Sequence, residues 1–449
     1  MAAARGQFAS RIGFILAAAG SAVGLGNIWG FPTQAASNGG AAFVVVYLIL
    51  AFVLAYPVLM AELLIGRHAH GNAITALRMI SNSTLSRGIG TVAGSLGIVT
   101  ASFILSFYGV VAGWMLGFTA AYPLEVVGLA EAAVWFETFS EPRNLLLMLA
   151  FMAMTIGIVI GGVHDGIERW SVRLMPALIA TLVLLALYVL TLDGAMDGLK
   201  VYLLPDFSKI WSGGLILNAL GAAFFSLSLG VGTMLIYGSY VSDEEHLPSV
   251  GVQVALIDVG IAVLAGFLIL PAMYVALERG VDIFDASGAL LSEDTLIFTV
   301  LPALFESLGS VGTVIATAFF GLMSVAALTS SISMLEVPVA FLVEHYTMPR
   351  KRAAIVAGLV ITGISATIVF NFDALFGLVI AATTRYAQPA GGLAFCLFAG
   401  WVWHRDTLLA ELRKNNLAAE AGFFWKIWPW YVRLICPAII SVIVVRSLL

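Results

Sequence analysis

The chain contains few charged side chains. Asp, Glu, Lys and Arg make up only 10% of its 449 residues, whereas 61% are hydrophobic and the mean hydropathy is +1.02. An ordinary soluble domain has about 25% charged and about 45–50% apolar residues. The scarcity of charge excludes a typical soluble enzyme and a disordered protein. It predicts a chain whose solvent is the lipid bilayer.

A surplus of basic residues is also missing. The formal net charge is −5 at pH 7, and a nucleic-acid-binding surface needs a basic face that contacts phosphates. We therefore expect no nucleic-acid partner. Nothing in the sequence indicates an obligate protein partner either.

Common enzyme motifs are absent as well. The sequence contains no phosphate-binding loop, no His-Glu-x-x-His and no Gly-x-Ser-x-Gly. The two cysteines, Cys396 and Cys436, both lie in apolar runs, which argues against a structural disulfide. We predict that the chain is not an enzyme and has no catalytic residues.

Long apolar runs dominate what is present. A membrane-crossing helix needs roughly 20 apolar residues, and these runs are continuous rather than alternating, which excludes a strand barrel. We predict an all-α integral membrane protein with eleven transmembrane helices, and a short amphipathic helix near 293–308 in a loop. The predicted spans are 11–34, 40–65, 89–122, 144–161, 168–191, 213–240, 248–275, 312–343, 353–370, 375–402 and 428–447.

The distribution of positive charge predicts the orientation. Roughly three quarters of the Lys and Arg residues, including the run 350–352, fall in loops on the same side as the N-terminus. In membrane proteins generally, the cytoplasmic loops carry such an excess of Lys and Arg. We therefore expect a protein of the cell inner (plasma) membrane with a cytoplasmic N-terminus. An odd number of spans then places the C-terminus outside.

Two spans carry residues that disfavour a continuous helix. The first contains three glycines and an Asn within 20–27, and the sixth contains glycines and serines within 226–232. Unwound backbone is tolerated in a membrane only around a cavity or inside protein, and paired breaks are typical of inverted-repeat transporters. Close helix packing through glycine is the alternative interpretation. The breaks predict a 5+5 inverted repeat with broken helices 1 and 6: a first five-helix repeat over 1–200, a second over 201–403, and an inner loop with the eleventh helix over 404–449.

Several motifs resemble one known family. The run from Gly20 to Pro32, GSAVGLGNIWGFP, is similar to the first-helix motif of the neurotransmitter:sodium symporters, and the sixth and eighth spans match in the same order. Gly166 and Pro176 also keep a spacing typical of that family. The resemblance covers nearly the whole chain and is greatest to the eleven-span, bacterial leucine-transporter-like branch. It implies cotransport of amino acids with sodium by alternating access. A channel or a non-transporting amino-acid sensor on the same fold is the alternative.

The resemblance implies two sodium sites. Ordinary hydrogen bonding of helix hydroxyls to backbone carbonyls is the alternative for 329–331. The first site would use the Ala22 carbonyl, Asn27, Ser226 and residue 258. The second site would use the carbonyls of Gly20, Val23 and Ala326 with the hydroxyls of Thr329 and Ser330.

Position 258 departs from the family pattern. Many relatives have Asn there, whereas this chain has Asp258. Of the chloride site of animal relatives, Tyr47 is retained and Ala222 replaces a Gln. Ala262 stands where some bacterial relatives have a Glu instead. A carboxylate in a membrane core needs a partner. Our hypothesis is that Asp258 supplies the negative charge and that transport needs no chloride. A protonated Asp258 that only supports packing is the alternative.

The resemblance also implies a substrate pocket for a neutral, hydrophobic amino acid. The amides of the first break and the Tyr108 hydroxyl would hold the carboxylate, and carbonyls near Phe225 and Ser228 would hold the amine. The expected substrate-binding residues are Ser21, Ala22, Gly24, Leu25, Gly26, Ile104, Tyr108, Phe225, Ser226, Ser228, Val231, Ser330 and Met334.

The two gates are expected to differ, because the cytoplasmic gate has a charged pair and the outer gate does not. Arg5 and Glu344 match the cytoplasmic gate pair, with Tyr240 nearby, although a weak surface ion pair is the alternative. Many relatives have a charged outer gate, and the resemblance places Gly30 and Phe376 at its two positions, so outer closure would rest on packing with Phe225 as a lid. Asp373, one turn before Phe376, is the alternative gate acid.

One cation, Arg385, lies near the middle of a predicted span. Arg385 has no obvious partner in the sequence around it. It is interpreted either as the partner of Glu62 or Glu336 in an ion pair or as a gating residue.

Overall fold

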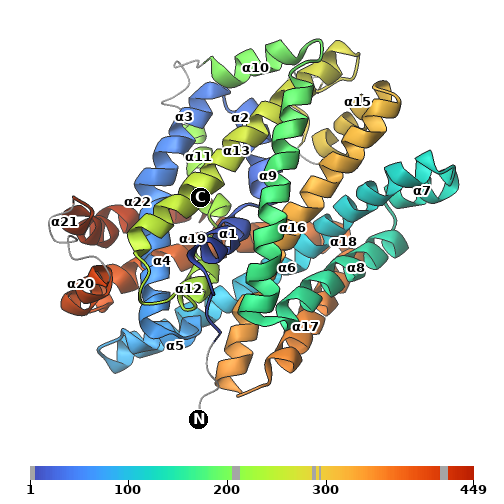
Figure 1. Ribbon diagram of the computed structural model, residues 1–449. Coiled ribbons are helices and arrows are strands. Elements are labelled where there is room, and N and C mark those ends of the chain that lie inside the picture. Colours follow the sequence, from blue (N-terminus) through green and yellow to red (C-terminus); the bar gives the residue numbers. More distant parts are fainter. Residues whose placement is uncertain (1–5, 205–212, 286–289, 293–294, 415–422, 449) are drawn as a thin grey trace.

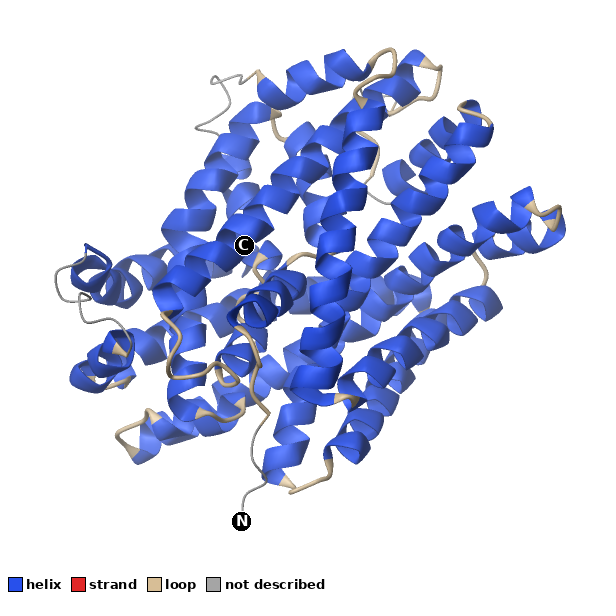
Figure 2. Cartoon of the chain, in the orientation of Figure 1, coloured by secondary structure: helices blue, strands red, loops and turns tan. Residues whose placement is uncertain are grey.

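The described part of the chain is built from helices and loops. The computed structural model describes residues 6–204, 213–285, 290–292, 295–414 and 423–448. Within those residues Figure 2 shows helices throughout and no strand. The prediction of an all-α architecture is therefore confirmed.

Among the described residues, seven helices are long and apolar enough to cross a bilayer. A bent pair at the N-terminus makes up to eight. The seven are α3–α4 (Ala41–Ala69), α6 (Thr84–Val126), α8 (Glu141–Ile160), Val163–Val189 including α9 (Arg169–Val189), α13 (Leu247–Glu278), α16 (Ser310–His345) and α17 (Arg350–Phe370). A multi-pass membrane protein is thus confirmed, while the count of eleven and the inverted repeat stay predictions.

The first span is broken where the glycines predicted it. Helix α1 (Arg11–Ala22) ends at Val23, whose backbone is extended, and a helix resumes over Gly26–Ser37 at an angle of 58°. A Cβ on Gly24 would lie 2.6 Å from Ser330 Oγ, and one on Gly26 would lie 2.8 Å from the Phe225 ring. Glycine is required here because other side chains approach the backbone closely.

The sixth span is broken as well. Helix α11 (Gly213–Ser226) stops six residues before α12 (Thr233–Gly238) resumes. Ser228, Gly230 and Gly232 between them have positive φ values of 51°, 83° and 82°. Only glycine adopts this backbone freely, so the left-handed Ser228 marks a constrained position in the break.

The long helices enclose both breaks. Helix α16 packs along α6, and both contact α8 and α17, while α13 packs against α9, α1 and the helix after the first break. Figure 1 shows α7 (Ala130–Glu137) and α10 (Ala195–Leu203) at one end of this bundle and α5 (Ala73–Met79) at the other. The breaks therefore lie in the middle of the molecule.

The remaining segments complete the bundle. The short helix predicted near 293–308 is confirmed as Leu296–Ser307, which includes α15 (Leu301–Ser307). Cys396 and Cys436 are buried free thiols, in agreement with the prediction that they form no disulfide. The last helices are α18 (Phe372–Ile380), a π-helical turn (Ala381–Ala387), α19 (Gln388–Leu397), a second such turn (Phe398–Val402), α20 (Arg405–Arg413), α21 (Phe423–Trp430) and α22 (Cys436–Leu448).

Candidate substrate and ion sites

A small pocket lies between the two breaks. Most of the predicted substrate-binding residues line it, but Ser21 and Ser226 do not. The Ser21 hydroxyl instead donates to Ser333 Oγ over 2.6 Å. The lining residues are Ala22, Gly24, Leu25, Gly26, Asn27, Ile104, Tyr108, Phe225, Ser228, Val231, Ser330, Met334 and Gln388.

Gln388 is the lining residue that the sequence analysis missed. It begins α19, from the predicted tenth span, and its side chain is buried. A polar residue three positions after Arg385, near the middle of a predicted span, was the available signal, because polar groups at such depth are costly and often functional.

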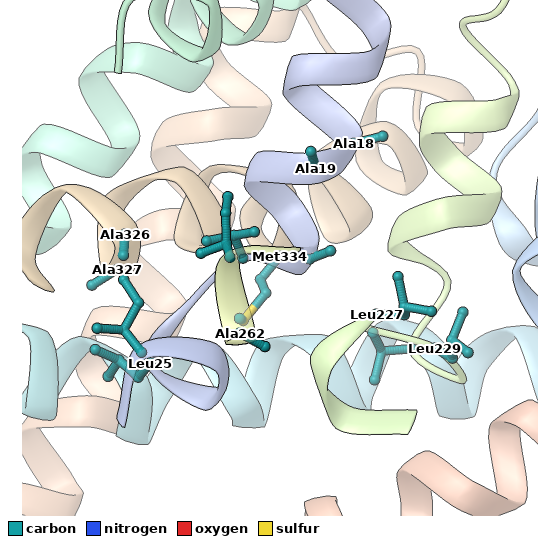
Figure 3. Close-up of a cluster of buried hydrophobic side chains, with 14 of the residues drawn as sticks. Ala18, Ala19, Leu25, Leu227, Leu229, Ala262, Ala326, Ala327 and Met334 are labelled. Carbon is teal, nitrogen blue, oxygen red and sulfur yellow. The ribbon is translucent and has the colours of Figure 1, made fainter. Parts of the chain in front are cut away.

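One end of the pocket is polar and formed by the first break. The Leu25 amide donates to the Tyr108 hydroxyl oxygen over 3.3 Å, and the Gly24 amide donates to Asn27 Oδ1 over 3.2 Å. Figure 3 shows the ribbon of the first span losing its helical turn between Ala19 and Leu25. Amides turned out of a helix in this way suit an anion such as a carboxylate.

Four side chains meet in a buried cluster beside this break. Asn27 Nδ2 donates to Asp258 Oδ1 over 2.7 Å and to Ser226 Oγ over 2.8 Å. The Ser226 hydroxyl donates to Asp258 Oδ2 over 2.7 Å, and the Tyr47 hydroxyl donates to Ser226 Oγ over 3.2 Å. The structure thus brings together three of the side chains predicted for the first ion site, from three different spans, with Tyr47 added.

The oxygens predicted for the second ion site also converge. The Ser330 hydroxyl lies 3.0 Å from the Val23 carbonyl and 3.3 Å from the Gly20 carbonyl, and Thr329 Oγ1 lies 3.0 Å from the Ala326 carbonyl. A Cβ on Gly20 would lie 3.2 Å from Thr329 Cβ, so α1 and α16 are close here. Five uncharged oxygens suit a hard monovalent cation, and the hydroxyl–carbonyl bonds of the alternative interpretation are formed as well.

Comparison with known proteins gives the family. The sequence profile of the sodium:neurotransmitter symporter family matches residues 5–126 and 138–449. The chain belongs to this family. The symporter is 35% identical over 453 residues to an uncharacterized sodium-dependent transporter, YhdH, of Bacillus subtilis, covering 97% of this chain and 96% of that one. It is 32% identical over 471 residues to an uncharacterized sodium-dependent transporter of Haemophilus influenzae, covering 99% and 98%.

A solved structure agrees with this assignment. The crystal structure of MhsT in complex with L-phenylalanine matches with a TM-score of 0.83 and 37% identity, covering 99% of this chain and 100% of that chain. The symporter is therefore a sodium-dependent membrane transporter with a fold similar to that of MhsT. The prediction that it is not an enzyme is confirmed.

The predicted gate pair of Arg5 and Glu344 stays a prediction, and the structure shows other contacts of Glu344 and Tyr240 on the α5 side of the symporter. Arg5 lies outside the described residues. Glu344 Oε2 accepts hydrogen bonds from the backbone amide and the side-chain amide of Asn72, both over 2.7 Å. The Tyr240 hydroxyl donates to Glu336 Oε1 over 2.6 Å. Glu344 and Tyr240 therefore both tie neighbouring segments together at this end.

The predicted ion pair between Arg385 and Glu336 or Glu62 is wrong. Arg350, at the start of α17, donates to both oxygens of Glu336 over 2.9 and 2.6 Å. Glu62 Oε1 accepts from the Gly230 amide over 2.7 Å. Arg385 is exposed and lines a large cavity beside the pocket. The sequence could not show that the loop before α17 returns Arg350 to a glutamate 14 positions earlier.

A cavity of about 1480 Å³ opens from the pocket toward the α7 end of the symporter. It is called the outer cavity, after the side of the membrane on which the predicted topology places the α7 end. Leu25, Gly26, Tyr108, Phe225 and Gln388 line both the cavity and the pocket, so they form the boundary between the two. Phe225 therefore lies between the pocket and the cavity, and its role as a lid stays a prediction.

An aromatic cluster occupies the wall of the outer cavity. The Phe376 ring lies 4.5 Å from that of Phe372 and 5.8 Å from that of Trp114. Phe298, from the loop helix before α15, lies 5.6 Å from Trp114 and 5.7 Å from Trp29. Packed rings therefore form the part of the cavity wall around Phe376.

Proposed function

We propose that the protein is a sodium-coupled symporter of neutral, hydrophobic amino acids that works by alternating access. The observation that carries this proposal is the convergence of two oxygen clusters on the breaks that also form the pocket. An ion at either cluster would stabilise the same broken backbone that holds the solute, which couples the two energetically.

The pocket chemistry supports an amino acid. Amides of the first break and the Tyr108 hydroxyl would bind the carboxylate, while carbonyls released by the sixth break near Phe225 and Ser228 would bind the ammonium group. The side-chain end is lined by Ile104, Val231 and Met334, and no charged residue lines the pocket. MhsT, which has the same fold, was crystallised with L-phenylalanine. A neutral, hydrophobic side chain fits this lining best.

The ion clusters support sodium at two positions. The second set, Gly20, Val23, Ala326, Thr329 and Ser330, offers only neutral oxygens, which suits a singly charged cation. The first set would combine the Ala22 carbonyl, Asn27, Ser226 and Asp258. Asp258 brings a full negative charge there, so the protein itself would supply the anion and transport would need no chloride.

The topology completes the proposal. Eleven spans in a 5+5 inverted repeat would place the cytoplasmic N-terminus and the Tyr240 gate on one side, with the outer cavity and the C-terminus on the other. In alternating access, the segments around the two breaks would open toward one side at a time.

Uptake into proteoliposomes tests this function. Radiolabelled leucine or phenylalanine should accumulate saturably with an inward sodium gradient and stop when potassium replaces sodium. Asn27→Ala, which removes one proposed sodium ligand, should raise the sodium requirement or abolish uptake, whereas a change at the exposed Asp193 should have no effect. Uptake that never saturates would indicate a channel, and binding without uptake would indicate a sensor.

A further inference from the structure

The side chain of Gln388 ends in an unused hydrogen-bond acceptor. Gln388 is 3% exposed and lines both the pocket and the outer cavity. Its Oε1 atom is buried and has no hydrogen-bond partner in the described chain. Most buried polar atoms in proteins are paired, because an unmade hydrogen bond is costly, so this atom calls for a donor that the chain does not supply.

The other polar side chains of the pocket already have partners. The Ser228 hydroxyl donates to the Ser21 carbonyl over 2.9 Å, and the Ser330 hydroxyl donates to the Val23 carbonyl over 3.0 Å. Asn27 is bonded to Asp258, and Tyr108 accepts from the Leu25 amide. Gln388 therefore differs from them, since its acceptor is both buried at the pocket and free.

The position of Gln388 relates it to the side-chain end of a bound solute. A Cβ on Gly230, in the sixth break, would lie 2.0 Å from the Gln388 carbonyl, so α19 lies directly against that break. Val231, the next residue of the break, lines the pocket with Ile104 and Met334. The carboxylate end is at the first break instead, beside Tyr108. With the ammonium group assigned to the carbonyls near Phe225 and Ser228, the donor left for Gln388 is one on the solute side chain, beyond its apolar part.

We propose that Gln388 Oε1 accepts a hydrogen bond from the ring substituent of an aromatic amino acid, namely the tyrosine hydroxyl or the indole N–H of tryptophan. These side chains carry a neutral donor on an otherwise apolar ring, which matches the apolar lining and its lack of charge. The Phe225 ring and the Met334 thioether favour aromatic neighbours. Gln388 is then a specificity-determining residue that selects tyrosine and tryptophan over phenylalanine. This inference rests on the proposed amino-acid transport.

Paired substrates test the assignment in proteoliposomes with a sodium gradient. The ratio of kcat/KM should favour tyrosine over phenylalanine, and tryptophan over 1-methyltryptophan, by about tenfold or more, since a site built to bond a donor rejects the analogue that lacks it. Gln388→Leu should bring both ratios close to one while phenylalanine uptake continues. Thr384→Val, one turn away with its hydroxyl bonded to the Ile380 carbonyl, should leave the ratios unchanged.

The outcomes separate the two proposals. Wild-type ratios near one would overturn the role of Gln388 whether or not the variant folds, and so would ratios that survive Gln388→Leu or Gln388→Met. In either case sodium-driven uptake of phenylalanine would leave the proposed function intact. Absence of sodium-driven uptake for leucine, phenylalanine, tyrosine and tryptophan alike would overturn the proposed function, and this inference with it.

Discussion

The side-chain amide of Asn27 donates to Oδ1 of Asp258 over 2.7 Å, although the two residues are 231 positions apart. Both are buried, and Ser226 donates to the other carboxylate oxygen. Two spans and the sixth break thus meet at one carboxylate. An acid at this depth needs compensation, and a cation bound beside it supplies the strongest kind.

Asp258 should make transport independent of chloride. Wild-type uptake is expected to stay unchanged when gluconate replaces chloride. Asp258→Asn keeps the shape but removes the charge that attracts sodium in a low-dielectric site, so the sodium concentration for half-maximal uptake should rise about tenfold or more, which corresponds to about 1.4 kcal/mol. Asp193→Asn, at an exposed position, is the matched control. A collapse of wild-type uptake in gluconate would reject the hypothesis.

Phe298 should contribute to closure of the outer cavity. Its ring contacts those of Trp29, Trp114, Phe118 and Phe139 at centroid distances of 5.4 to 5.7 Å. Phe298→Ala removes these contacts, which are worth about 0.5–1.5 kcal/mol each beyond burial, and is expected to slow maximal uptake several-fold. Phe298→Leu should retain more of the rate.

A cysteine probe can report this closure directly. A Cβ at Gly30 meets no atom within 4 Å, and Gly30 lines the outer cavity, so Gly30→Cys should be tolerated and reachable. Substrate plus sodium should protect this cysteine from a membrane-impermeant maleimide. The Phe298→Ala variant should lose most of that protection. Equal protection in both backgrounds would show that the ring has no part in closure.

Removing one partner of the ion pair between Glu336 and Arg350 should destabilise the fold more than removing both. Glu336 is fully buried and also accepts from Tyr240, so Arg350→Gln leaves a buried carboxylate uncompensated and should cost about 3–5 kcal/mol. Glu336→Gln combined with Arg350→Gln should be less destabilised than Arg350→Gln alone. The measurement is thermal unfolding of the purified protein in detergent. Strictly additive losses would argue against coupling of these two residues.

The charge cluster around Glu411 should make the folding stability depend on pH in the acidic range. Glu411 in α20 lies 2.6 Å from Arg67 Nε and 3.0 Å from Lys414 Nζ. Burial raises the pKa of Glu411, but its hydrogen bond with His68 and the charges of Arg67 and Lys414 outweigh burial and lower the pKa to about 2. A depressed folded-state pKa gives stability that is complete above the unfolded pKa, near 4.3.

That stability should be lost as the pH falls from about 4.3 toward 2. The unfolding midpoint of the wild type is expected to decrease across this window. Glu411→Gln should start lower at pH 7 and change less between pH 5 and pH 3. A variant at the exposed Asp406, in the same helix, should follow the wild-type profile. If the unfolding midpoints of Glu411→Gln and the wild type change with pH in parallel, the Glu411 carboxylate is not the source of the pH dependence.

Much of the architecture could be predicted from the sequence alone. The membrane environment followed from scarce charge, because a polar exterior cannot be built from so few polar residues. The breaks followed from glycines and small polar residues in the middle of two spans, since these residues lose little stability when they leave the helix. The resemblance of the motif from Gly20 to Pro32 then indicated the family, and residues such as Asn27, Thr329 and Tyr108 could be assigned by position.

Only the tertiary structure decided which side chains are partners. Arg350 rather than Arg385 bonds Glu336 because the turn before α17 returns the chain to α16, and a charge pattern along the sequence does not encode that distance. Gln388 became a pocket residue because α19 lies against Gly230, more than 150 positions earlier. Helical periodicity specifies which residues enter a membrane and where a helix breaks. Partners between distant spans are set by how the helices pack, which depends on all of the spans at once.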